Sequence, residues 1–292
     1  MSGWRIVMIG SNAKLDLLQG WMVVRKGNHV DKVFINDIQT LIIESTAVSL
    51  TAALLAALTK AKVKIIFCDE KHLPSAELVP YYGAHDSTRK IRAQAKWSEA
   101  TKAAVWTAIV AEKIRKQEQL LIKLGSDRHA ILADHRQHLV LADATNREGQ
   151  AARVYFTALF GLDFSRGSDT SINAALNYGY NMLMAAFCRE IVACGYVTQL
   201  GLCHDSVYNP YNLASDLMEP YRPLVDEAVH AMQPQWFTHD EKRQLVQILN
   251  RTVVLNKRSE LVSNAIRLYC LSVFDAIDHD DVSRIRWYDN EL

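Results

Sequence analysis

The sequence is poor in the features that mark several large classes of protein. Its 292 residues include only 12 Gly and 6 Pro, which excludes collagen-like chains and Gly- or Pro-rich disordered chains. The most apolar window, residues 47–58, contains Ser49 and Thr51 and is followed by Lys60, so it is too short and too polar to span a bilayer. The N-terminus has no basic stretch before a long apolar run, so no secretory signal is expected. We therefore expect a cytoplasmic protein without a membrane partner.

Cysteine is also scarce and badly spaced for cross-linking. The five cysteines, an odd number, include no pair in a C-x-x-C spacing. This argues against a disulfide framework and against a structural zinc ribbon. The sequence predicts buried, reduced thiols in a reducing compartment. These residues are Cys68, Cys188, Cys194, Cys203 and Cys270.

Several common catalytic motifs are missing. The sequence has no Gly-rich phosphate loop, no G-x-G-x-x-G after a strand, no H-E-x-x-H and no G-x-S-x-G. Nucleotide hydrolysis, dinucleotide redox chemistry, zincin proteolysis and elbow-type serine hydrolysis are therefore disfavoured.

The charge is nearly balanced overall but is unevenly distributed. The formal net charge is +1, which excludes a uniformly basic nucleic-acid coat protein. Residues 89–128 carry ten Lys/Arg and four Asp/Glu, whereas residues 129–292 carry fourteen and twenty. A basic helix beside an acidic region is typical of a phosphate-binding surface next to a cation site. A solvated helix face explains the same pattern, and charge alone favours that explanation.

The pattern of apolar residues changes about a quarter of the way along the chain. Short β-branched and aromatic runs broken by Gly and Asn predict strands at 5–9, 15–17, 21–24, 30–35, 41–44 and 63–68. Ser45 resembles the N-cap of an intervening helix. Helical spacing then predicts helices within 89–124, 146–160, 170–194, 211–232 and 238–278.

These elements predict an α+β fold. We expect a small β-rich N-terminal domain at residues 1–74 and a larger, all-helical C-terminal domain at residues 89–292. The stretch 75–88 contains Pro80, Gly83 and Ser87 and is the predicted linker.

Three segments of the predicted helical domain carry candidate metal ligands. Glu148 follows Thr145 and Asn146, either of which could cap a helix, so a favourable helix-start carboxylate is a strong structural explanation of it. His204 lies in the irregular stretch 201–205, where a lone histidine is more often a structural hydrogen-bonding residue. Asp216 and Glu219 are three residues apart and would share one helix face. An unpaired charge at the core boundary is costly, so this face needs a metal, an arginine partner such as Arg222, or exposure.

Each of these residues taken alone favours a structural role, but together they form a coherent ligand set. Glu148, His204 and Glu219 offer two hard oxygen ligands and one imidazole. This combination suits Mg²⁺ or Mn²⁺, and the imidazole favours Mn²⁺ somewhat.

Four segments resemble the signature segments of the CRISPR-associated integrase family, which inserts new spacers into repeat arrays. They occur in the family's order along essentially the whole chain, whose compact length is similar to members from type II systems. The segments are Asn146-Arg147-Glu148-Gly149, Leu176-Asn177-Tyr178-Gly179-Tyr180, residues 201–204 and Asp216-Leu217-Met218-Glu219-Pro220-Tyr221-Arg222-Pro223.

The resemblance implies a reaction and a set of residue roles. Glu148, His204 and Glu219 would be the catalytic metal ligands for Mg²⁺ or Mn²⁺, and Asp216 would be an accessory acid. The 3′-hydroxyl of a short protospacer DNA duplex would attack a phosphodiester at the edge of a CRISPR repeat. This transesterification needs no covalent enzyme intermediate, in line with the missing nucleophile motifs.

The resemblance also implies partners in a prokaryotic cytoplasm. The protein would form a homodimer largely through its N-terminal domain, and a dimer of a small ferredoxin-like protein would bridge two homodimers. The resemblance strengthens the interpretation of the basic stretch, residues 89–128, as a DNA-binding surface. Its further cations are Lys90, Lys113, Arg115, Lys116 and Lys123. The predicted DNA-binding residues are Arg89, Arg92, Lys96, Arg147 and Arg222. Tyr178 and Tyr180 could contact DNA or belong to the core.

Two other functions remain open at this point. A non-catalytic DNA-binding scaffold subunit of the same adaptation complex would not depend on a divalent metal. A helical phosphohydrolase would turn over small nucleotides without duplex or branched DNA. The presence of every expected ligand favours the integrase and endonuclease.

Overall fold

The computed structural model describes residues 3–70, 72, 74–78, 84 and 86–290. The chain divides into two compact units, residues 1–82 and 83–292. The predicted linker is therefore wrong for its first residues, because β8 (Pro74–Leu78) pairs antiparallel with β7 (Lys64–Cys68) inside the first unit. It is also wrong at its end, where α2 (Ser87–Gln94) already begins. Residues 79–83 and 85 lie outside the described part of the chain.

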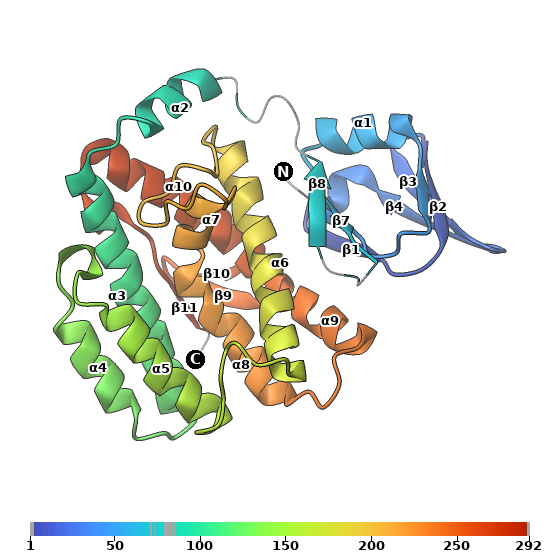
Figure 1. Cartoon of the computed structure of the whole chain (residues 1–292). Helices are drawn as coiled ribbons and strands as arrows, with labels where there is room; N and C mark the ends of the chain where they lie inside the picture. Colours follow the sequence, from blue (N-terminus) through green and yellow to red (C-terminus); the bar gives the residue numbers. More distant parts are fainter. Residues whose placement is uncertain (1–2, 71, 73, 79–83, 85, 291–292) are drawn as a thin grey trace. The chain divides into compact units, whose positions relative to one another are not determined.

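The described residues of the N-terminal unit form two sheets, one α-helix and one short 3-10 helix, and the strand-rich sequence predicts this β-rich composition (Figure 1). One sheet has the order β1-β5-β7-β8, with β1, β5 and β7 parallel. The other has the order β4-β3-β2-β6. The elements not yet given are β1 (Arg5–Ile9), β2 (Ala13–Leu18), β3 (Trp21–Lys26), β4 (His29–Phe34), η1 (Ile35–Asp37), β5 (Ile38–Ile43), β6 (Val48–Leu50) and α1 (Ala52–Lys60).

Two tight turns set the register of the second sheet. Leu18 pairs with Trp21, so Gln19 and Gly20 form a two-residue turn in which both φ angles are positive. Lys26 pairs with His29 across a second two-residue turn, in which Gly27 has a positive φ and Asn28 does not. The alternating side chains of these strands pack against α1 and the first sheet in one core. Its fully buried members include Leu15, Met22, Leu41, Leu54, Leu58 and Ile65.

The helix of this unit begins later than Ser45, so that N-cap prediction is wrong. Ser45 Oγ accepts a hydrogen bond from the Ala47 amide in a turn. The chain then forms β6, which pairs parallel with β2. Thr51 is the actual N-cap and accepts from the Leu54 amide at 3.3 Å. The apolar residues of β6 mimic the start of a helical pattern because they lie next to the helix in the sequence.

The C-terminal unit is mainly helical. Its helices are α2, α3 (Glu99–Lys123), α4 (His129–Gln137), η2 (Leu141–Asp143), α5 (Arg147–Phe160), α6 (Ser171–Ala193), α7 (Asn212–Leu217), η3 (Glu219–Tyr221), α8 (Arg222–Met232), α9 (His239–Val246), η4 (Gln247–Asn250), α10 (Val262–His279) and η5 (Val282–Arg284).

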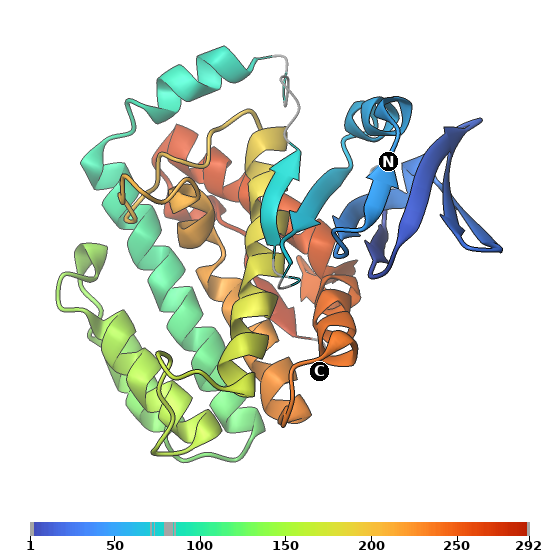
Figure 2. The same ribbon diagram turned by 45° about the vertical axis from the view of Figure 1, so that its right-hand side comes forward.

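Long helices form the framework of this unit. Figure 1 shows α4 and α5 beside α3, and the turned view in Figure 2 shows α6 running along α10. Helix α6 also packs closely on α8, because a Cβ at Gly179 would lie 2.4 Å from a methyl carbon of Val225. Tyr178 and Tyr180, on either side of this glycine, are buried at 0% and 7% exposure. They belong to the core rather than to a DNA-contacting surface.

The prediction of an all-helical C-terminal domain is wrong, because this unit contains a small antiparallel sheet in the order β10-β9-β11. Its strands are β9 (Thr252–Leu255), β10 (Arg258–Leu261) and β11 (Tyr288–Asn290). Asn256 and Lys257 connect β9 to β10 with positive φ angles of 52° and 63°. This hairpin interrupts the segment that the sequence predicts as helix. Its short strands and Asn-Lys turn lack the usual Asn-Gly signal.

Two simpler predictions can be compared directly with the structure. Within the described residues, each helix is too short or too polar to cross a bilayer. Four cysteines are buried as predicted, but Cys203 is exposed next to His204.

Candidate functional site

Glu148 is held at the beginning of α5 by a strong N-terminal cap. Asn146 is the N-cap, in a left-handed conformation, and its Oδ1 accepts from the Gly149 amide at 3.2 Å. Asp143 adds a second cap, because its two carboxylate oxygens accept from the amides of Arg147 and Glu148 at 2.6 and 3.0 Å. These bonds satisfy amides that the first helical turn leaves open. The Glu148 side chain therefore projects from a rigid position.

His204 lies on the loop between α6 and α7, and Asp216 fixes the conformation of that loop. Asp216 is fully buried, and its Oδ2 accepts from the amides of Leu202 and Cys203 at 2.5 and 3.1 Å. Its Oδ1 accepts from the His204 amide at 3.1 Å and from His204 Nδ1 at 2.6 Å. A carboxylate can only accept, so Nδ1 carries the proton and Nε2 has the lone pair. The hydrogen bond to Asp216 raises the pKa of His204, against the opposing effect of burial.

Gly201 allows this loop to approach Asp216 so closely. A Cβ at this position would lie 2.3 Å from the His204 carbonyl oxygen and 2.7 Å from Asp216 Oδ2. Asn212, at the start of α7, closes the loop further because its Nδ2 donates to the carbonyls of Gln199 and Ser206, both at 3.0 Å. The loop is therefore a fixed support for His204.

Glu219 and Asp216 are close in sequence but face different partners. Helix α7 ends at Leu217, and η3 begins at Glu219, so the regular helix predicted across both residues is broken. Asp216 faces the His204 loop, whereas Glu219 Oε1 accepts from Arg222 Nε at 2.8 Å. The proposed local arginine partner is therefore confirmed. Both carboxylate oxygens of Asp216 accept hydrogen bonds that orient the loop and the imidazole.

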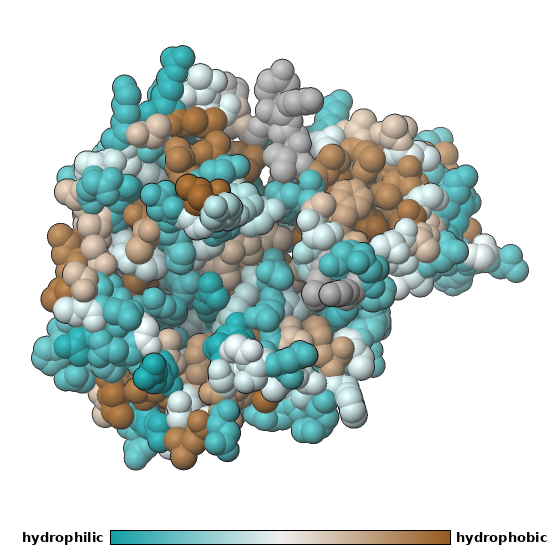
Figure 3. All heavy atoms as spheres, viewed as in Figure 1, coloured by the Kyte–Doolittle hydropathy of each residue, from teal (hydrophilic) through white to brown (hydrophobic). Residues whose placement is uncertain are grey.

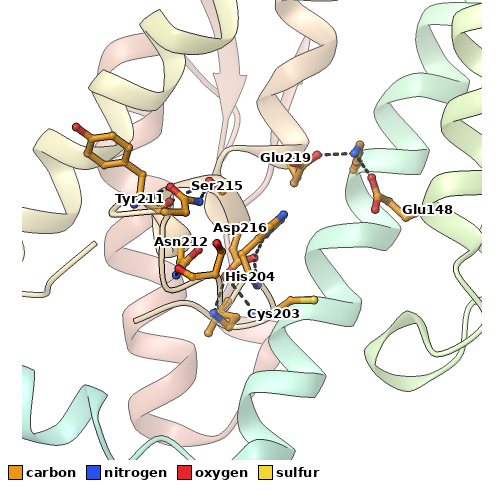
Figure 4. A network of polar contacts seen from close by, with 12 residues as sticks. Glu148, Cys203, His204, Tyr211, Asn212, Ser215, Asp216 and Glu219 are labelled. Carbon is orange, nitrogen blue, oxygen red and sulfur yellow. Dashed lines mark hydrogen bonds and ion pairs between the residues drawn. The ribbon is translucent and has the colours of Figure 1, made fainter. Parts of the chain in front are cut away.

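Lys113 of α3 joins the two glutamates that the sequence singles out. Its ammonium pairs with Glu148 Oε1 and lies 2.5 Å from Glu219 Oε2. Figure 4 shows Glu148 and Glu219 pointing toward each other, with dashed contacts to the nitrogen between them. Burial alone would lower the pKa of Lys113, but the two carboxylates outweigh it and raise the pKa. Burial opposes the ionisation of Glu219, yet Lys113 and Arg222 lower its pKa.

The same face of α3 also contacts the histidine. Trp106 lies seven residues before Lys113, two helical turns away on one face, and its ring meets the His204 ring edge-on at 5.9 Å.

Within residues 3–70, 72, 74–78, 84 and 86–290, no three His, Cys, Asp or Glu side chains lie close enough to hold a metal as placed. Lys113 occupies the space between the two glutamates instead.

The donor chemistry nevertheless fits a hard divalent cation. Glu219 is 4% exposed, and its Oε2 is engaged by the Lys113 ammonium in an ion pair rather than in a hydrogen bond of good geometry. His204 has its Nδ1 on a buried carboxylate, which is the usual support of a metal-binding imidazole. Two carboxylates and one imidazole are ligands that Mg²⁺ and Mn²⁺ accept.

Three of the predicted DNA-binding residues lie on one exposed stripe. Arg89 and Arg92 of α2 and Lys96 just after it recur at helical spacing and are exposed. The opposite face of α2 is fastened to the loop after α6, where Lys90 donates to the Cys194 carbonyl at 2.8 Å. Gln94 binds the same loop through the Val197 and Leu200 carbonyls, both at 2.9 Å. We call Arg89, Arg92 and Lys96 the α2 stripe.

The other predicted cations are also paired inside the protein, as Arg89 of the α2 stripe is with Asp86 at 2.8 Å. Arg222 binds Glu219 and lies 4.6 Å above the Tyr180 ring. Arg147 is half-buried, with its Nη1 3.3 Å from His135 Nδ1. Arg115 and Lys116 both reach Asp289, and Lys123 reaches Glu227. Lys116 is therefore buried and engaged inside the unit, whereas Lys123 stays 62% exposed beside its ion pair, and the prediction that some α3 cations contact DNA stays a prediction.

The sequence missed three residues that build the site: Trp106, Lys113 and Asp143. Lys113 lay within the basic stretch, but nothing in the local pattern separates a lysine facing two carboxylates from one facing solvent. Asp143 precedes the capping residue by three positions, and an acid before a helix start is a weak capping signal.

Figure 3 shows mainly hydrophilic residues over the middle of this unit on the face viewed, with hydrophobic residues in smaller groups.

Comparisons with known proteins agree with this architecture. The sequence model of the family described as CRISPR associated protein Cas1 matches residues 6–257. The chain is 37% identical over 227 residues to the CRISPR-associated endonuclease Cas1 of Neisseria meningitidis serogroup C, covering 77% of this chain and 75% of that protein.

Two solved structures share the fold. A casposase bound to integration product superimposes with a TM-score of 0.79 at 18% identity, covering 96% of this chain and 93% of that one. A chain of a Cas6-RT-Cas1–Cas2 complex gives a TM-score of 0.76 at 16% identity, covering 97% of this chain and 36% of that one. The family match and the 37% identical relative confirm the resemblance drawn from the four sequence segments, and this chain belongs to the Cas1 family of CRISPR-associated proteins.

Proposed function

We propose that this protein is a divalent-metal-dependent DNA integrase and endonuclease that inserts short DNA duplexes into a CRISPR repeat array. The reaction is a transesterification in which a DNA 3′-hydroxyl attacks a phosphodiester at the repeat edge. The 37% identical relative is named an endonuclease, and the casposase of similar fold was captured with its integration product. Both names support the cleavage or joining of DNA phosphodiester bonds as the reaction of proteins with this fold.

The observation that carries the proposal is that Glu148 and Glu219 both contact the Lys113 ammonium, beside a histidine whose ring is held by a buried aspartate. The two glutamates come from α5 and η3, and both pair with Lys113. His204 comes from a third segment and is fixed by Asp216. A site that already gathers two carboxylates around a positive charge has the electrostatics that a divalent cation requires.

Glu148, His204 Nε2 and Glu219 would hold Mg²⁺ or Mn²⁺. When bound, the ion would supply Lewis-acid activation of the 3′-hydroxyl and stabilise charge on the phosphate. The protein's own residues orient the ligands: Asp216 fixes the imidazole tautomer, and Arg222 holds Glu219 through Nε. Because Glu219 is almost fully buried, Arg222 also offsets the cost of keeping that carboxylate charged.

DNA would approach along the α2 stripe, which is joined through Lys90 and Gln94 to the segment leading to His204. A homodimer formed through the N-terminal unit, bridged by a small ferredoxin-like partner, is the assembly we propose for the cytoplasm of a prokaryote. The similar fold in a Cas6-RT-Cas1–Cas2 complex supports a second protein in the assembly.

The test is strand transfer on a branched DNA that mimics a half-integrated product. Wild type is compared with Glu148→Gln in Mn²⁺, Mg²⁺ or chelator. Glu227→Gln is the matched control, because Glu227 is a half-buried glutamate held by two cations, Lys123 and Arg251, away from the site. We expect metal-dependent joining by wild type and the control, and a loss of about 10²-fold or more in Glu148→Gln.

Two other results would separate the alternatives. Wild type that binds branched DNA but never joins it with any metal would be a scaffold subunit. Turnover of free nucleotides without any joining would indicate a small-substrate phosphohydrolase.

A further inference from the structure

Lys113 has an unusual position for a lysine on a basic helix. Its side chain is only 8% exposed, and its ammonium lies between the carboxylates of Glu148 and Glu219. These glutamates come from different elements, α5 and η3, and Lys113 comes from a third, α3. The ammonium is therefore a tertiary cross-link at the centre of the site.

The two glutamates need a positive charge between them. Glu219 is 5% exposed at its side chain and Glu148 is 29% exposed, so water screens their mutual repulsion only in part. Arg222 reaches Glu219 but has no ion pair with Glu148 among the contacts of the described residues. Lys113 is thus the cation shared by both.

We propose that Lys113 is a built-in counterion that holds Glu148 and Glu219 together before the metal binds and is displaced from them by the metal. This inference rests on the proposed function, since it takes the two glutamates as metal ligands. An ammonium and a divalent cation that use the same carboxylate oxygens repel each other at close range, so the two states exclude one another. The measured metal affinity is then weaker than the affinity of the three ligands alone, because part of the binding free energy is used to move Lys113 away from the glutamates.

A neutral side chain at position 113 has two opposite effects under this proposal. It leaves the glutamates without a counterion in the metal-free protein, which lowers thermal stability. It also removes the competitor, which tightens metal binding. A lysine that merely positioned the glutamates would give the reverse effect on affinity, because its loss would loosen the ligands.

The experiment measures Mn²⁺ affinity calorimetrically, without DNA, for wild type, Lys113→Met and Lys116→Met. Lys116 is the matched control: it lies on the same helix and is 2% exposed, but it binds Asp289 and the Tyr288 carbonyl. We expect Lys113→Met to lower the Mn²⁺ Kd by about tenfold or more, as coupling between close charge pairs allows. Lys116→Met should keep the wild-type Kd, even if it lowers thermal stability.

Thermal unfolding of the same proteins in chelator and in saturating Mn²⁺ gives a second readout. Lys113→Met should unfold at a lower temperature than wild type in chelator, and Mn²⁺ should raise its Tm by more than it raises that of wild type. Lys113→Gln, which keeps a polar group at the site, serves if the methionine variant does not fold.

The outcomes distinguish this inference from the proposed function. Wild type that binds Mn²⁺, with an equal or weaker affinity in the Lys113 variants, would overturn only the counterion role. Wild type that binds no Mn²⁺ would overturn the metal site, and the counterion role with it.

Discussion

Asp216 Oδ1 and His204 Nδ1 are 2.6 Å apart, and this single contact determines which imidazole nitrogen is available to a ligand. The other bonds of Asp216 go to the loop amides from Leu202 to His204. One buried carboxylate therefore fixes the loop, the ring orientation and the tautomer together. The resemblance implied an accessory acid at this position, and the contacts support a positioning role.

Asp216→Asn should weaken metal binding while leaving the three proposed ligands in place. An amide presents one acceptor and one donor to partners that all donate, so one side of the cluster becomes repulsive. Losing the partner of a ligating histidine typically costs about 10–100-fold in metal affinity, and we expect that range for Mn²⁺. Calorimetric titration of the variant against wild type measures it.

Asp226→Asn is the control for this measurement, since Asp226 is a buried aspartate bonded to Tyr155 and Tyr180. It should retain the wild-type Mn²⁺ affinity. An unchanged affinity in Asp216→Asn would show that the histidine needs no carboxylate support.

Gly201→Ala should abolish strand transfer through displacement of the His204 loop. The added methyl group would overlap the His204 carbonyl oxygen and Asp216 Oδ2, at 2.3 and 2.7 Å. Relief requires the loop to move, at a cost of about 1–3 kcal/mol in stability. Activity and thermal unfolding are measured together. Gly167→Ala is the control, because the nearest atom to a Cβ there is a serine oxygen at 3.9 Å. Full activity in Gly201→Ala would mean that the loop tolerates a different path.

The sequence predicted the parts of this site that depend on local chemistry. A helix cap at Thr145 or Asn146 and an irregular stretch around His204 follow from capping and Gly signals, and the structure contains both, with Asn146 as the cap. The strand-rich beginning follows from β-branched runs and turn residues. Each of these signals lies within a few residues of the feature it predicts.

The missed features depend on contacts between distant segments. Lys113 and Glu148 are 35 residues apart, and no periodicity in either segment indicates that they meet. The sequence predicts helix across the β9–β10 hairpin because each strand has only four residues, too few for an alternating pattern to stand out. In the sequence Lys116 resembles a DNA-binding cation. In the structure β11 packs against α3 and places Asp289 beside it, and this pairing is not visible in the local sequence.

Arg92→Glu should weaken DNA binding and reduce its salt dependence. Arg92 is the middle residue of the α2 stripe and is exposed. If it contacts a phosphate, its loss lowers the slope of log K against log salt by about 1. Fluorescence anisotropy with branched DNA at several salt concentrations measures both quantities.

Arg243→Glu, an exposed arginine of α9, is the matched charge reversal for this comparison. It should shift the affinity only slightly and leave the slope unchanged. Equal effects of the two variants would mean that only net charge matters and that the α2 stripe is an ordinary solvated face.

Asp226 should make stability fall as the pH rises from about 4 to 6. Burial raises its pKa to about 6, although Tyr180 and Tyr155 donate hydrogen bonds to its carboxylate. Between the unfolded pKa of about 4 and the folded value, the folded state keeps a proton that the unfolded state releases. The free energy of unfolding therefore decreases with pH across this window, by about 3 kcal/mol in total, and the full loss is present above pH 6.

Asp226→Asn removes this titration, so its unfolding free energy relative to wild type should rise by about 2–3 kcal/mol between pH 4 and 7. Denaturant unfolding at each pH measures the difference between the two proteins, in which contributions from all other groups cancel. Asp163→Asn, at an exposed site, is the matched control. A flat difference for Asp226→Asn would mean that the two tyrosine hydroxyls stabilise the buried carboxylate enough to offset its lost hydration. In that case the folded-state pKa of Asp226 would lie at or below its unfolded value, and the aspartate would be charged over most of the measured range.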